Sequence, residues 1–454
     1  MSEEVPAGFK NTEIGVIPKE WHIEKIGDLF DVKQGKQISS KESKEGKKLR
    51  PFLRTSNVFW GKIDTTNIDE MPFFDDKFDE LKLQKNDILV CEGGDVGRTA
   101  LWREEIDECA YQNHLHRLRS KQKKIIDHVF FVFWMEFAIQ QKRMYVSRAN
   151  RTTIPNLSSS RLKSFEIPIP SFLEQQKIAH VLTAVQDAKE KTEAVITATQ
   201  ELKKSMMKYL FTYGPVPISE APDVPLKETE IGMIPEEWEL LRLDSIAKTF
   251  SGATPLRRNE EYYNNGNISW LKSGELNDGY IIKTEEFITE KAVEETSVKF
   301  VPKNTLLIAM YGATAGKVGF TTFETTINQA ICAIIPKEDY FHSKFYYYWM
   351  QYHREILLRK RFGGAQQNLN QQIIKQMQVP FPTLVQQKCI ALILETIDMK
   401  IKEEENKKNA LDGLFKSMLI NLMIGMIRVK DLDLDIGLEV QEEGLKMVDN
   451  HVGK

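Results

Sequence analysis

The stretch TEIGVIPKEW, Thr12 to Trp21, recurs as TEIGMIPEEW, Thr229 to Trp238, with eight of ten positions identical. The two copies begin 217 residues apart in a chain of 454 residues. A repeat has to be recognised before elements are assigned, because a missed repeat leads to the wrong architecture. The decamer therefore predicts a duplicated chain.

The similarity continues beyond the decamer, in the same order in both halves. It includes Gly-containing turns, an aromatic run and a segment marked by two prolines. The clearest matches are KNDILVCEGGDVGR (Lys85–Arg98) with KNTLLIAMYGATAGK (Lys303–Lys317), FFVFWMEF with FYYYWMQY, and EIPIPSFLEQQKIA (Glu166–Ala179) with QVPFPTLVQQKCI (Gln378–Ile390). Two long copies indicate a duplicated domain pair rather than a solenoid, which stacks many repeats of roughly 20 to 50 residues.

Each half has two unlike parts. The first alternates short β-rich runs with Gly-containing turns and one aromatic, helix-like segment, which predicts a mixed α+β globule. The second follows Pro168-Ile169-Pro170 or Pro380-Phe381-Pro382 and predicts one long helix, at about residues 173–211 and 385–424. At 1.5 Å per residue each helix would be roughly 60 Å long.

The long helices carry narrow apolar stripes with heptad spacing, which is typical of helices that pack lengthwise on each other. A polar pair lies in the middle of each stripe. The first predicted seam is Ile178, Val181, Val185, Ala188, Thr192, Val195, Thr199, Leu202, Met206 and Tyr209. The second is Leu394, Ile397, Ile401, Glu404, Lys408, Leu411, Phe415, Met418 and Leu422.

The predicted fold class is therefore α+β, with two mixed α/β domains in a duplicated, pseudo-two-fold arrangement and two long antiparallel coiled-coil helices between them. The expected segments are a first globule at 1–170, a central helix at 171–214, a linker and second globule at 215–382, a C-terminal helix at 383–426 and a peripheral tail at 427–454. We expect Trp21 and Trp238 to be packing anchors where each globule meets a helix.

Composition predicts a cytoplasmic protein. The chain is 41% hydrophobic and 28% charged, and no apolar run approaches the roughly 18 residues that a membrane helix needs. Its four cysteines form no CxxC pair, which argues against a disulfide framework and a zinc site. We therefore expect no membrane association and no metal bound by this chain.

Net charge is −3, but charges are segregated along the chain. Residues 33–54 hold eight Lys and Arg against two acids, residues 117–163 eleven against two, and residues 62–80 seven acids against two lysines. Such segregation allows a basic face on a near-neutral molecule, which a phosphate backbone would require.

Enzyme motifs are weak. Gly312 to Lys317 resembles a phosphate loop, but its glycines are one residue too close and Val318 stands where Ser or Thr should bind magnesium. Asp64 or Asp69 with Glu80 and Lys82 mimics a nuclease, yet the second half lacks these residues. No catalytic centre is indicated.

Loop residues suited to DNA occur in both halves. Gly-rich loops allow close backbone approach, Arg and Lys bind phosphate or guanine, and amides can read adenine. The predicted DNA-contacting residues are Lys33, Lys36, Arg54, Gly94, Arg98, Gln112, Asn113, His114, Arg148, Arg151, Thr152, Arg257, Arg258, Lys272, Lys317, Asn328, Gln329, Arg361, Gln366 and Gln367.

In this combination the motifs resemble the specificity subunit of type I restriction-modification systems. The resemblance rests on the twin EIGxIPxEW segments, the IPIPSFLEQQKIA and VPFPTLVQQKCIA helix starts, and the helix endings LKKSMMKYLFTYG and LFKSMLINLMIGMIRV. It covers nearly the whole chain apart from the extreme N-terminus and the tail after about Val429.

The resemblance implies a non-catalytic DNA reader. Each globule would be a target recognition domain that reads one half of a bipartite, asymmetric site in double-stranded DNA, and the helices would set the spacing between half-sites. Two methyltransferase subunits would dock on the helices and supply S-adenosylmethionine chemistry, and restriction and translocation subunits would use ATP and Mg²⁺. No cofactor is expected in this chain.

Two other classes remain open from sequence: a stand-alone nuclease or methyltransferase, and a purely structural coiled-coil scaffold. The modest net charge further predicts weak DNA affinity without partner subunits.

Overall fold

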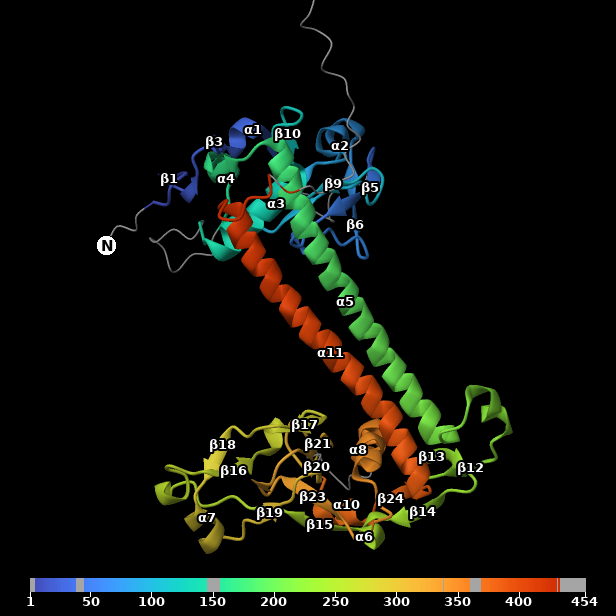
Figure 1. Ribbon diagram of the computed structural model, residues 1–454. Helices are drawn as coiled ribbons and strands as arrows, with labels where there is room; N and C mark the ends of the chain where they lie inside the picture. The colour runs from blue at the N-terminus through green and yellow to red at the C-terminus, as the bar shows by residue number, and fades with distance from the viewer. Residues whose placement is uncertain are drawn as a thin grey trace, which may run out of the picture. The chain divides into compact units, whose positions relative to one another are not determined.

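The structure is a computed structural model that describes residues 5–37, 45–144, 156–337, 339–359, 369–430 and 432. Its contacts divide the chain into unit 1, residues 1–191 with 407–454, and unit 2, residues 192–406. Each unit contains one globule and one end of each of two long helices, α5 (Phe172–Tyr213) and α11 (Leu384–Met423) (Figure 1).

The globule of unit 1 combines short strands with short helices. Its four-stranded sheet has the order β4-β10-β7-β8, and a three-stranded sheet has the order β6-β5-β9. The elements are β1 (Phe9–Thr12), β2 (Gly15–Pro18), β3 (His22–Lys25), α1 (Ile26–Leu29), β4 (Phe30–Gln34), β5 (Lys48–Leu53), η1 (Thr55–Asn57), β6 (Asp69–Phe73), α2 (Asp75–Leu81), β7 (Ile88–Cys91), β8 (Thr99–Leu101), β9 (Ala110–Tyr111), β10 (Leu115–Ser120), α3 (His128–Glu136), η2 (Phe137–Gln141), α4 (Ser159–Ser164) and β11 (Glu166–Ile169).

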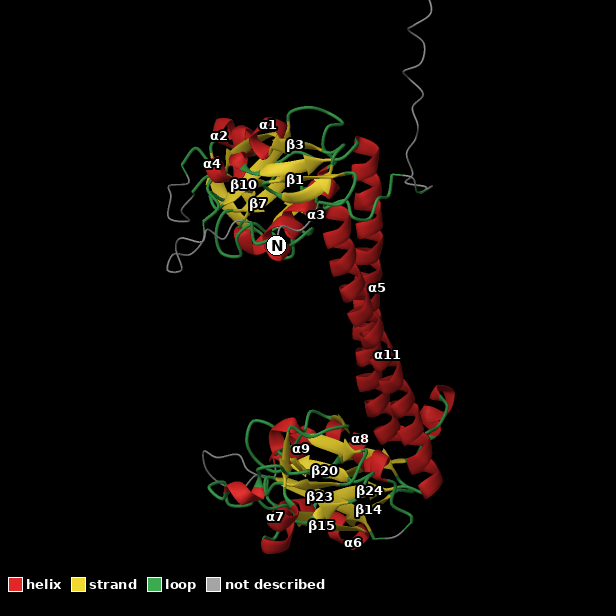
Figure 2. Cartoon of the chain, turned by 60° about the vertical axis from the view of Figure 1, so that its left-hand side comes forward, coloured by secondary structure: helices red, strands yellow, loops and turns green. Residues whose placement is uncertain are grey.

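The globule of unit 2 also combines short strands with short helices (Figure 2). Its sheets have the orders β15-β23-β20-β21-β17 and β18-β16-β22-β19. The elements are η3 (Ile218–Asp223), β12 (Leu226–Thr229), β13 (Gly232–Pro235), β14 (Glu239–Arg242), α6 (Leu243–Ile246), β15 (Ala247–Ser251), η4 (Glu260–Tyr262), β16 (Ile268–Leu271), η5 (Ser273–Glu275), β17 (Gly279–Ile281), β18 (Glu286–Ile288), α7 (Glu290–Glu295), β19 (Phe300–Val301), β20 (Leu306–Ala309), β21 (Val318–Thr321), β22 (Thr325–Ile327), β23 (Ile331–Pro336), α8 (Ser343–Tyr352), α9 (Arg354–Arg359), α10 (Gln371–Gln376) and β24 (Gln378–Phe381).

The aromatic runs lie in the core. In unit 1, α3 buries its aromatic side chains and Phe133 contacts Phe415 of α11. In unit 2, α8 does the same, and Phe345 contacts Phe211 of α5. These runs attach each globule to the long helices and are too buried to stack on nucleobases.

The repeated decamer supplies the turn and the second strand of a two-stranded ribbon in each unit, β1-β2 and β12-β13. Thr12 Oγ1 donates to the Gly15 carbonyl and Thr229 Oγ1 to the Gly232 carbonyl, both at 2.6 Å. Since Gly15 and Gly232 have φ of 111° and 106°, which favours glycine, the Thr-x-x-Gly spacing is a requirement of the turn.

The tryptophans that end the decamers are packing anchors, as predicted. Trp21 and Trp238 are each 1% exposed. Trp21 lies against Gly425, just after α11, and Trp238 against Gly214, just after α5. Both glycines have positive φ, 68° and 79°, as residues that end helices commonly do. The tryptophan of each decamer therefore packs against the C-terminal end of a long helix.

Buried glutamines explain the Pro-x-Pro and Gln-Gln-Lys pattern. Gln175 Nε2 donates to the Pro170 carbonyl at 3.0 Å, and its Oε1 accepts from the Asp127 amide at 2.8 Å. Gln387 makes the same bonds to Pro382 at 2.9 Å and to His342 at 2.9 Å. One side chain thus joins the start of a long helix to the start of the aromatic helix.

Within each unit the long helices pack side by side and run antiparallel. In unit 1, Lys177 reaches the Lys430 carbonyl at 2.8 Å, whereas the later Lys189 pairs with the earlier Asp412 at 2.6 Å. In unit 2, Lys203 pairs with Asp398 at 2.6 Å. Both helices begin and end within two residues of the expected positions.

The predicted seam of α5 is wrong at two positions. Val195 is 42% exposed and Leu202 is 50% exposed, whereas Ile196 and Met207 are each 6% exposed. A strict heptad was assumed, but 3.6 residues per turn shift the buried stripe along a helix of 42 residues. The polar centre was predicted correctly at Thr192 and Glu404, which are both buried in unit 2.

The beginning of the C-terminal tail is not peripheral. Val429 is 2% exposed, and Arg428 donates to both carboxylate oxygens of Glu174, at 2.7 and 2.9 Å. Glu174 also accepts from Trp21 Nε1 at 3.3 Å. Residues 428–430 therefore belong to the packed part of unit 1.

Candidate nucleic-acid interface

Both units carry a polar site at the same place in the fold, where a strand ends in a single 3₁₀ turn. In unit 1, β5 leads into η1, and the Leu53 carbonyl accepts from the Gln112 amide at 2.9 Å. In unit 2, β16 leads into η5, and the Leu271 carbonyl accepts from the Asn328 amide at 2.9 Å. The fold thus sets the predicted amide residues beside the predicted cations Arg54 and Lys272.

A glycine without room for a side chain holds each amide loop in place. A Cβ on Gly35 would lie 2.2 Å from the Gln112 carbonyl oxygen, and one on Gly252 would lie 1.9 Å from the Ile327 carbonyl oxygen. Neither residue needs a positive φ, so close backbone approach is the reason for glycine here. The loop before each site is consequently fixed against the loop that presents the amides.

The Gly-rich loops brace the 3₁₀ turns. Arg98 Nη2 donates to the Thr55 carbonyl at 2.9 Å, and Thr314 Oγ1 donates to the equivalent Ser273 carbonyl at 2.8 Å. The Arg98 side chain is only 14% exposed, and Lys317 Nζ donates to Asn277 Oδ1 at 3.0 Å. Arg98 and Lys317 therefore already have internal partners.

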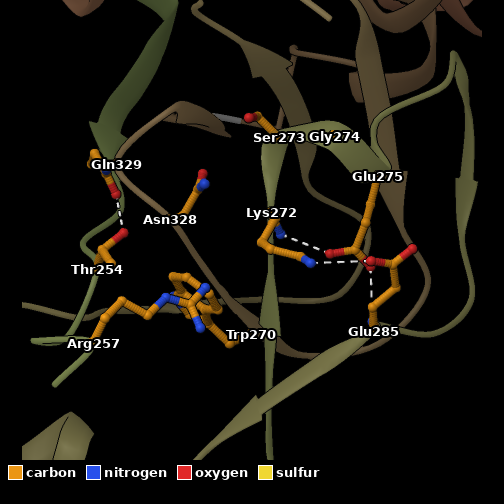
Figure 3. A pocket seen from close by; sticks show the side chains of 10 residues that line it. All are labelled: Thr254, Arg257, Trp270, Lys272, Ser273, Gly274, Glu275, Glu285, Asn328 and Gln329. Carbon is orange, nitrogen blue, oxygen red and sulfur yellow. Dashed lines mark hydrogen bonds and ion pairs between the residues drawn. The ribbon is translucent and has the colours of Figure 1, made fainter. Parts of the chain in front are cut away.

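The site of unit 2 is a pocket of about 530 Å³ (Figure 3). Four residues predicted from sequence line it together: Arg257, Lys272, Asn328 and Gln329. Thr254, Trp270, Ser273, Gly274, Glu275 and Glu285 complete the lining. Amide, cationic and carboxylate side chains therefore line the same open pocket.

Carboxylates hold both cations of this pocket. Glu286 accepts from Arg257 at 2.6 Å and pairs with Lys272 at 2.9 Å, and Glu285 pairs with Lys272 at 3.1 Å. The hydrogen bond from Arg257 is the main cause that lowers the pKa of the Glu286 carboxyl, and hydrogen bonds to Glu286 and Glu285 raise the pKa of Lys272. Glu286 is thus ionised at neutral pH.

The site of unit 1 repeats this arrangement with other side chains. Arg54 pairs with Asp69 at the start of β6, which corresponds to Glu286 at the start of β18. Asn57 Oδ1 accepts from the Arg54 amide at 2.8 Å, as Glu275 Oε1 accepts from the Lys272 amide at 2.9 Å. The two sites share a backbone frame and differ in the groups they present.

The remaining predicted residues are more scattered. Lys33 Nζ donates to the Glu80 carbonyl at 3.0 Å, Lys36 bridges to Gln112 through its backbone, and Gln34 Nε2 donates to the Asn113 carbonyl at 2.9 Å. Exposed residues include Gly94, His114 and Arg258. The predicted residues Arg148, Arg151, Thr152, Arg361, Gln366 and Gln367 lie outside the described residues.

Among the described residues of 33–54, four cations that were expected on a basic face pair with acids instead. The acidic run that follows folds back on the basic run, so charges that are separate in sequence pair in space. The pairs are Lys33 with Glu80 at 4.0 Å, Lys48 with Asp75 at 2.8 Å, Arg50 with Asp75 at 3.4 Å, and Arg54 with Asp69.

Sequence reasoning missed the capping side chains and the paired carboxylates of both sites. Asn57 and Glu275 could have been found, because each stands three residues after its cation at the N-terminus of a short turn, where a side chain caps backbone N–H groups. Asp69 and Glu286 carried no such signal, since each belongs to a stretch rich in acids. Their role depends on strand pairing, β5 with β6 and β16 with β18.

The described residues do not assemble the nuclease-like set. Asp64 accepts from Thr66 and Asp69 pairs with Arg54, so these acids serve separate local contacts. Among the described residues no group of three or more His, Cys, Asp or Glu is placed to hold a metal ion. In the same part of the chain no helix is both long and apolar enough to cross a membrane.

The family model described as the type I restriction modification DNA specificity domain matches this chain twice, at residues 18–200 and 235–412. The chain belongs to this family. It is the sequence-specific DNA-recognition component of a type I restriction-modification system and is itself non-catalytic. Each match covers most of one copy of the globule and its long helix.

Two curated relatives match this chain over nearly its full length. The type I restriction enzyme MjaVIII specificity subunit of Methanocaldococcus jannaschii is 24% identical, with 92% of this chain and 95% of that protein covered. A second subunit from this organism, provisionally named MjaX, is 26% identical, with coverage of 93% and 97%. The crystal structure of a type I S subunit from M. genitalium has the same fold, with a TM-score of 0.56 at 19% identity, covering 89% of this chain and 96% of that one.

Proposed function

We propose that this chain reads two different DNA half-sites, one with each unit, and that its long helices set the spacing between them. The observation that carries the proposal is the pair of equivalent sites that share one backbone frame. Gln112 and Asn113 occupy in unit 1 the positions of Asn328 and Gln329 in unit 2, and Arg54 occupies that of Lys272. Different side chains on one frame would read different bases, which makes the whole target asymmetric.

We also propose that methyltransferase subunits dock on the long helices. In unit 2, α11 exposes Val385, Leu392 and Met399 by 78%, 65% and 68%. These residues are seven apart and so lie on one face of the helix. An exposed apolar stripe of this kind suits an amphipathic helix from a partner.

The equivalent face in unit 1 is less apolar. The positions on α5 that correspond through Gln175 and Gln387 are Leu173, His180 and Asp187. We expect two methyltransferase copies, one for each face, and tighter docking on α11. Leu392→Glu should weaken association in a pull-down, whereas Leu256→Glu, a change of another exposed leucine, should leave it intact.

The proposal also assigns catalysis to partner subunits and the complex to the cytoplasm. This chain is expected to bind no cofactor, while partner subunits supply S-adenosylmethionine, ATP and Mg²⁺ chemistry, and restriction subunits join for cleavage. The complex would act in the cytoplasm, where it meets DNA. The full chain alone, supplied with S-adenosylmethionine and Mg²⁺, should neither methylate nor cut DNA; activity of the isolated chain would favour a stand-alone enzyme.

The test is selection from a pool of randomised duplexes by the full chain bound to its methyltransferase. At about 0.15 M salt, where non-specific phosphate binding is weakened, the bound fraction should be enriched in one bipartite sequence with unlike halves. Enrichment of no sequence would refute recognition and favour a scaffold. Enrichment of a single continuous sequence would refute the assignment of one half to each unit.

A further inference from the structure

The pocket of unit 2 has no surplus of positive charge. Its lining holds two cations, Arg257 and Lys272, and two acids, Glu275 and Glu285. Glu286 joins both cations from the adjoining strand β18. The pocket with Glu286 therefore contains three carboxylates and two cations.

A phosphate group would bind poorly in such a place. Contacts to the phosphates of the DNA backbone rely on cations that are free to bind them. Here each cation would first have to break an ion pair with a carboxylate at about 3 Å. The acids that remained would then repel the phosphate. A nucleobase edge meets no such obstacle, because it is uncharged and carries both donors and acceptors.

The lining offers partners for such an edge. Carboxylates accept from the amino groups of cytosine and adenine, amides pair with adenine, and Arg or Lys donates to guanine. Asn328 and the exposed Gln329 supply amides on the same lining as the carboxylates, and Lys272 lies between the two groups in the view of Figure 3. Gln329 Oε1 also accepts from Thr254 Oγ1, which orients the amide.

Arg257 is fixed on several sides. Its guanidinium carbon lies 4.8 Å from the ring centroids of both Tyr263 and Trp270, and its Nη1 donates to Glu286 at 2.6 Å. Cation–π contacts and the ion pair together hold the group in one orientation. Glu286 is the one member of this set that also binds Lys272.

We propose that the pocket of unit 2 takes the edge of a nucleobase, and that Glu286 determines this choice by holding Arg257 and Lys272 away from the phosphate backbone. Glu286 is therefore a positioning residue for sequence specificity. The inference rests on the proposed function, since it assumes that DNA lies across the pocket. Asp69, paired with Arg54, holds the corresponding place in unit 1.

The test compares Glu286→Gln with wild type, each as the full chain bound to its methyltransferase. The probe is a random-sequence duplex, titrated over a range of salt. Released cations add phosphate contacts, and each contact steepens the slope of log K against log salt by about 0.9. Lys272 keeps its pair with Glu285, so the variant chiefly releases Arg257. Glu286→Gln should therefore tighten non-specific binding by about tenfold at low salt and steepen the slope by about 1.

Glu324→Gln is the charge-matched control. Glu324 is an exposed acid of the same unit, so this variant has the same change in net charge and should retain the wild-type slope. Glu286→Asp, which keeps the carboxylate, should restore most of the wild-type behaviour. Thermal unfolding checks that the variants remain folded.

The outcomes separate the inference from the proposed function. If wild type selects a bipartite sequence and Glu286→Gln binds random duplex with the wild-type slope, the inference is wrong while the proposed function stands. The inference also fails if Glu324→Gln steepens the slope as much as Glu286→Gln. If wild type selects no sequence, the proposed function itself fails.

Discussion

Gly252 shows how a single residue fixes the position of the loop that carries Asn328. Any Cβ at this position would lie within 2 Å of the Ile327 carbonyl oxygen and would push away the loop that carries Asn328. We expect Gly252→Ala to cost about 1–3 kcal/mol in stability, as overpacking does, and to impair recognition of one half-site. Chemical denaturation and selection from randomised DNA measure the two effects.

The control for that prediction is Gly279→Ala. A Cβ at Gly279 has no heavy atom within 4 Å and no positive φ is required there. Its stability and DNA selection should match wild type. Equal damage by both substitutions would show that the effect of Gly252 does not come from the close approach.

Glu136 should make the stability of unit 1 depend on pH. Burial raises the pKa of its carboxyl to about 7, against 4.5 for the ordinary group. Because the folded pKa is the higher one, folding opposes ionisation, and stability is lost as pH rises from about 4.5 to about 7. Glu136→Gln removes this loss, so its stability advantage over wild type should grow by about 2 kcal/mol between pH 5 and pH 8.

Urea denaturation of both proteins at the two pH values measures that difference. Other groups titrate in both proteins alike and cancel in the comparison. An advantage that is equal at pH 5 and pH 8 would contradict a raised pKa at Glu136.

At the scale of elements, the packing of the long helices depends on a stripe of buried side chains. The sequence predicted only some of these positions. The bounds of α5 and α11 follow from uninterrupted runs after the Pro-x-Pro segments, and these were predictable. The buried positions were less so, because a helix can shift its stripe without any change in average composition. Val195 and Ile196 are adjacent, and only the structure shows which one is buried.

This difference gives a direct prediction. Ile196→Ala should destabilise unit 2 by about 2–4 kcal/mol, since it empties a buried position. Val195→Ala, at a position that is 42% exposed, should cost less than about 0.5 kcal/mol. Circular dichroism during denaturation measures both, and equal costs would contradict the observed packing.

The junction between globule and helix depends on the buried glutamines. Gln387 is 0% exposed and bonds to Tyr340, His342 and Pro382. Gln387→Ala should leave these backbone groups unpaired and cost on the order of 2–4 kcal/mol. The neighbouring Gln386→Ala changes a side chain with exposed partners and should be nearly neutral; a reversed order in denaturation experiments would refute this account.

At the scale of the whole molecule, duplication was the most predictable feature because it is carried by local rules. Thr-x-x-Gly turns, helix-ending glycines and buried glutamines need the same residues in both units. The sites were only partly predictable. The residue types of Lys272, Asn328 and Arg257 suggest contact with DNA. Glu286 and Asp69 reach their sites only because of strand pairing, which the spacing of the repeated motifs does not reveal.

The distribution of charge illustrates the same limit. The runs at 33–54 and 62–80 suggested a basic face when viewed along the chain, and folding brings them together as ion pairs. Sequence spacing gives charge per segment, whereas recognition depends on which charges lack a partner in space. The carboxylates in both sites therefore have to be part of any account of specificity.

The central claim is that each unit reads its own half of one DNA target. Methylation mapping of a genome that expresses this chain with its methyltransferase tests it most directly, when wild type is compared with Gln112→Ala and Asn328→Ala. Loss of one amide contact should cost about 1–3 kcal/mol at one base pair. We predict a bipartite methylated motif in which Gln112→Ala relaxes one half and Asn328→Ala relaxes the other. Changes in the same half, or in both halves together, would contradict the claim.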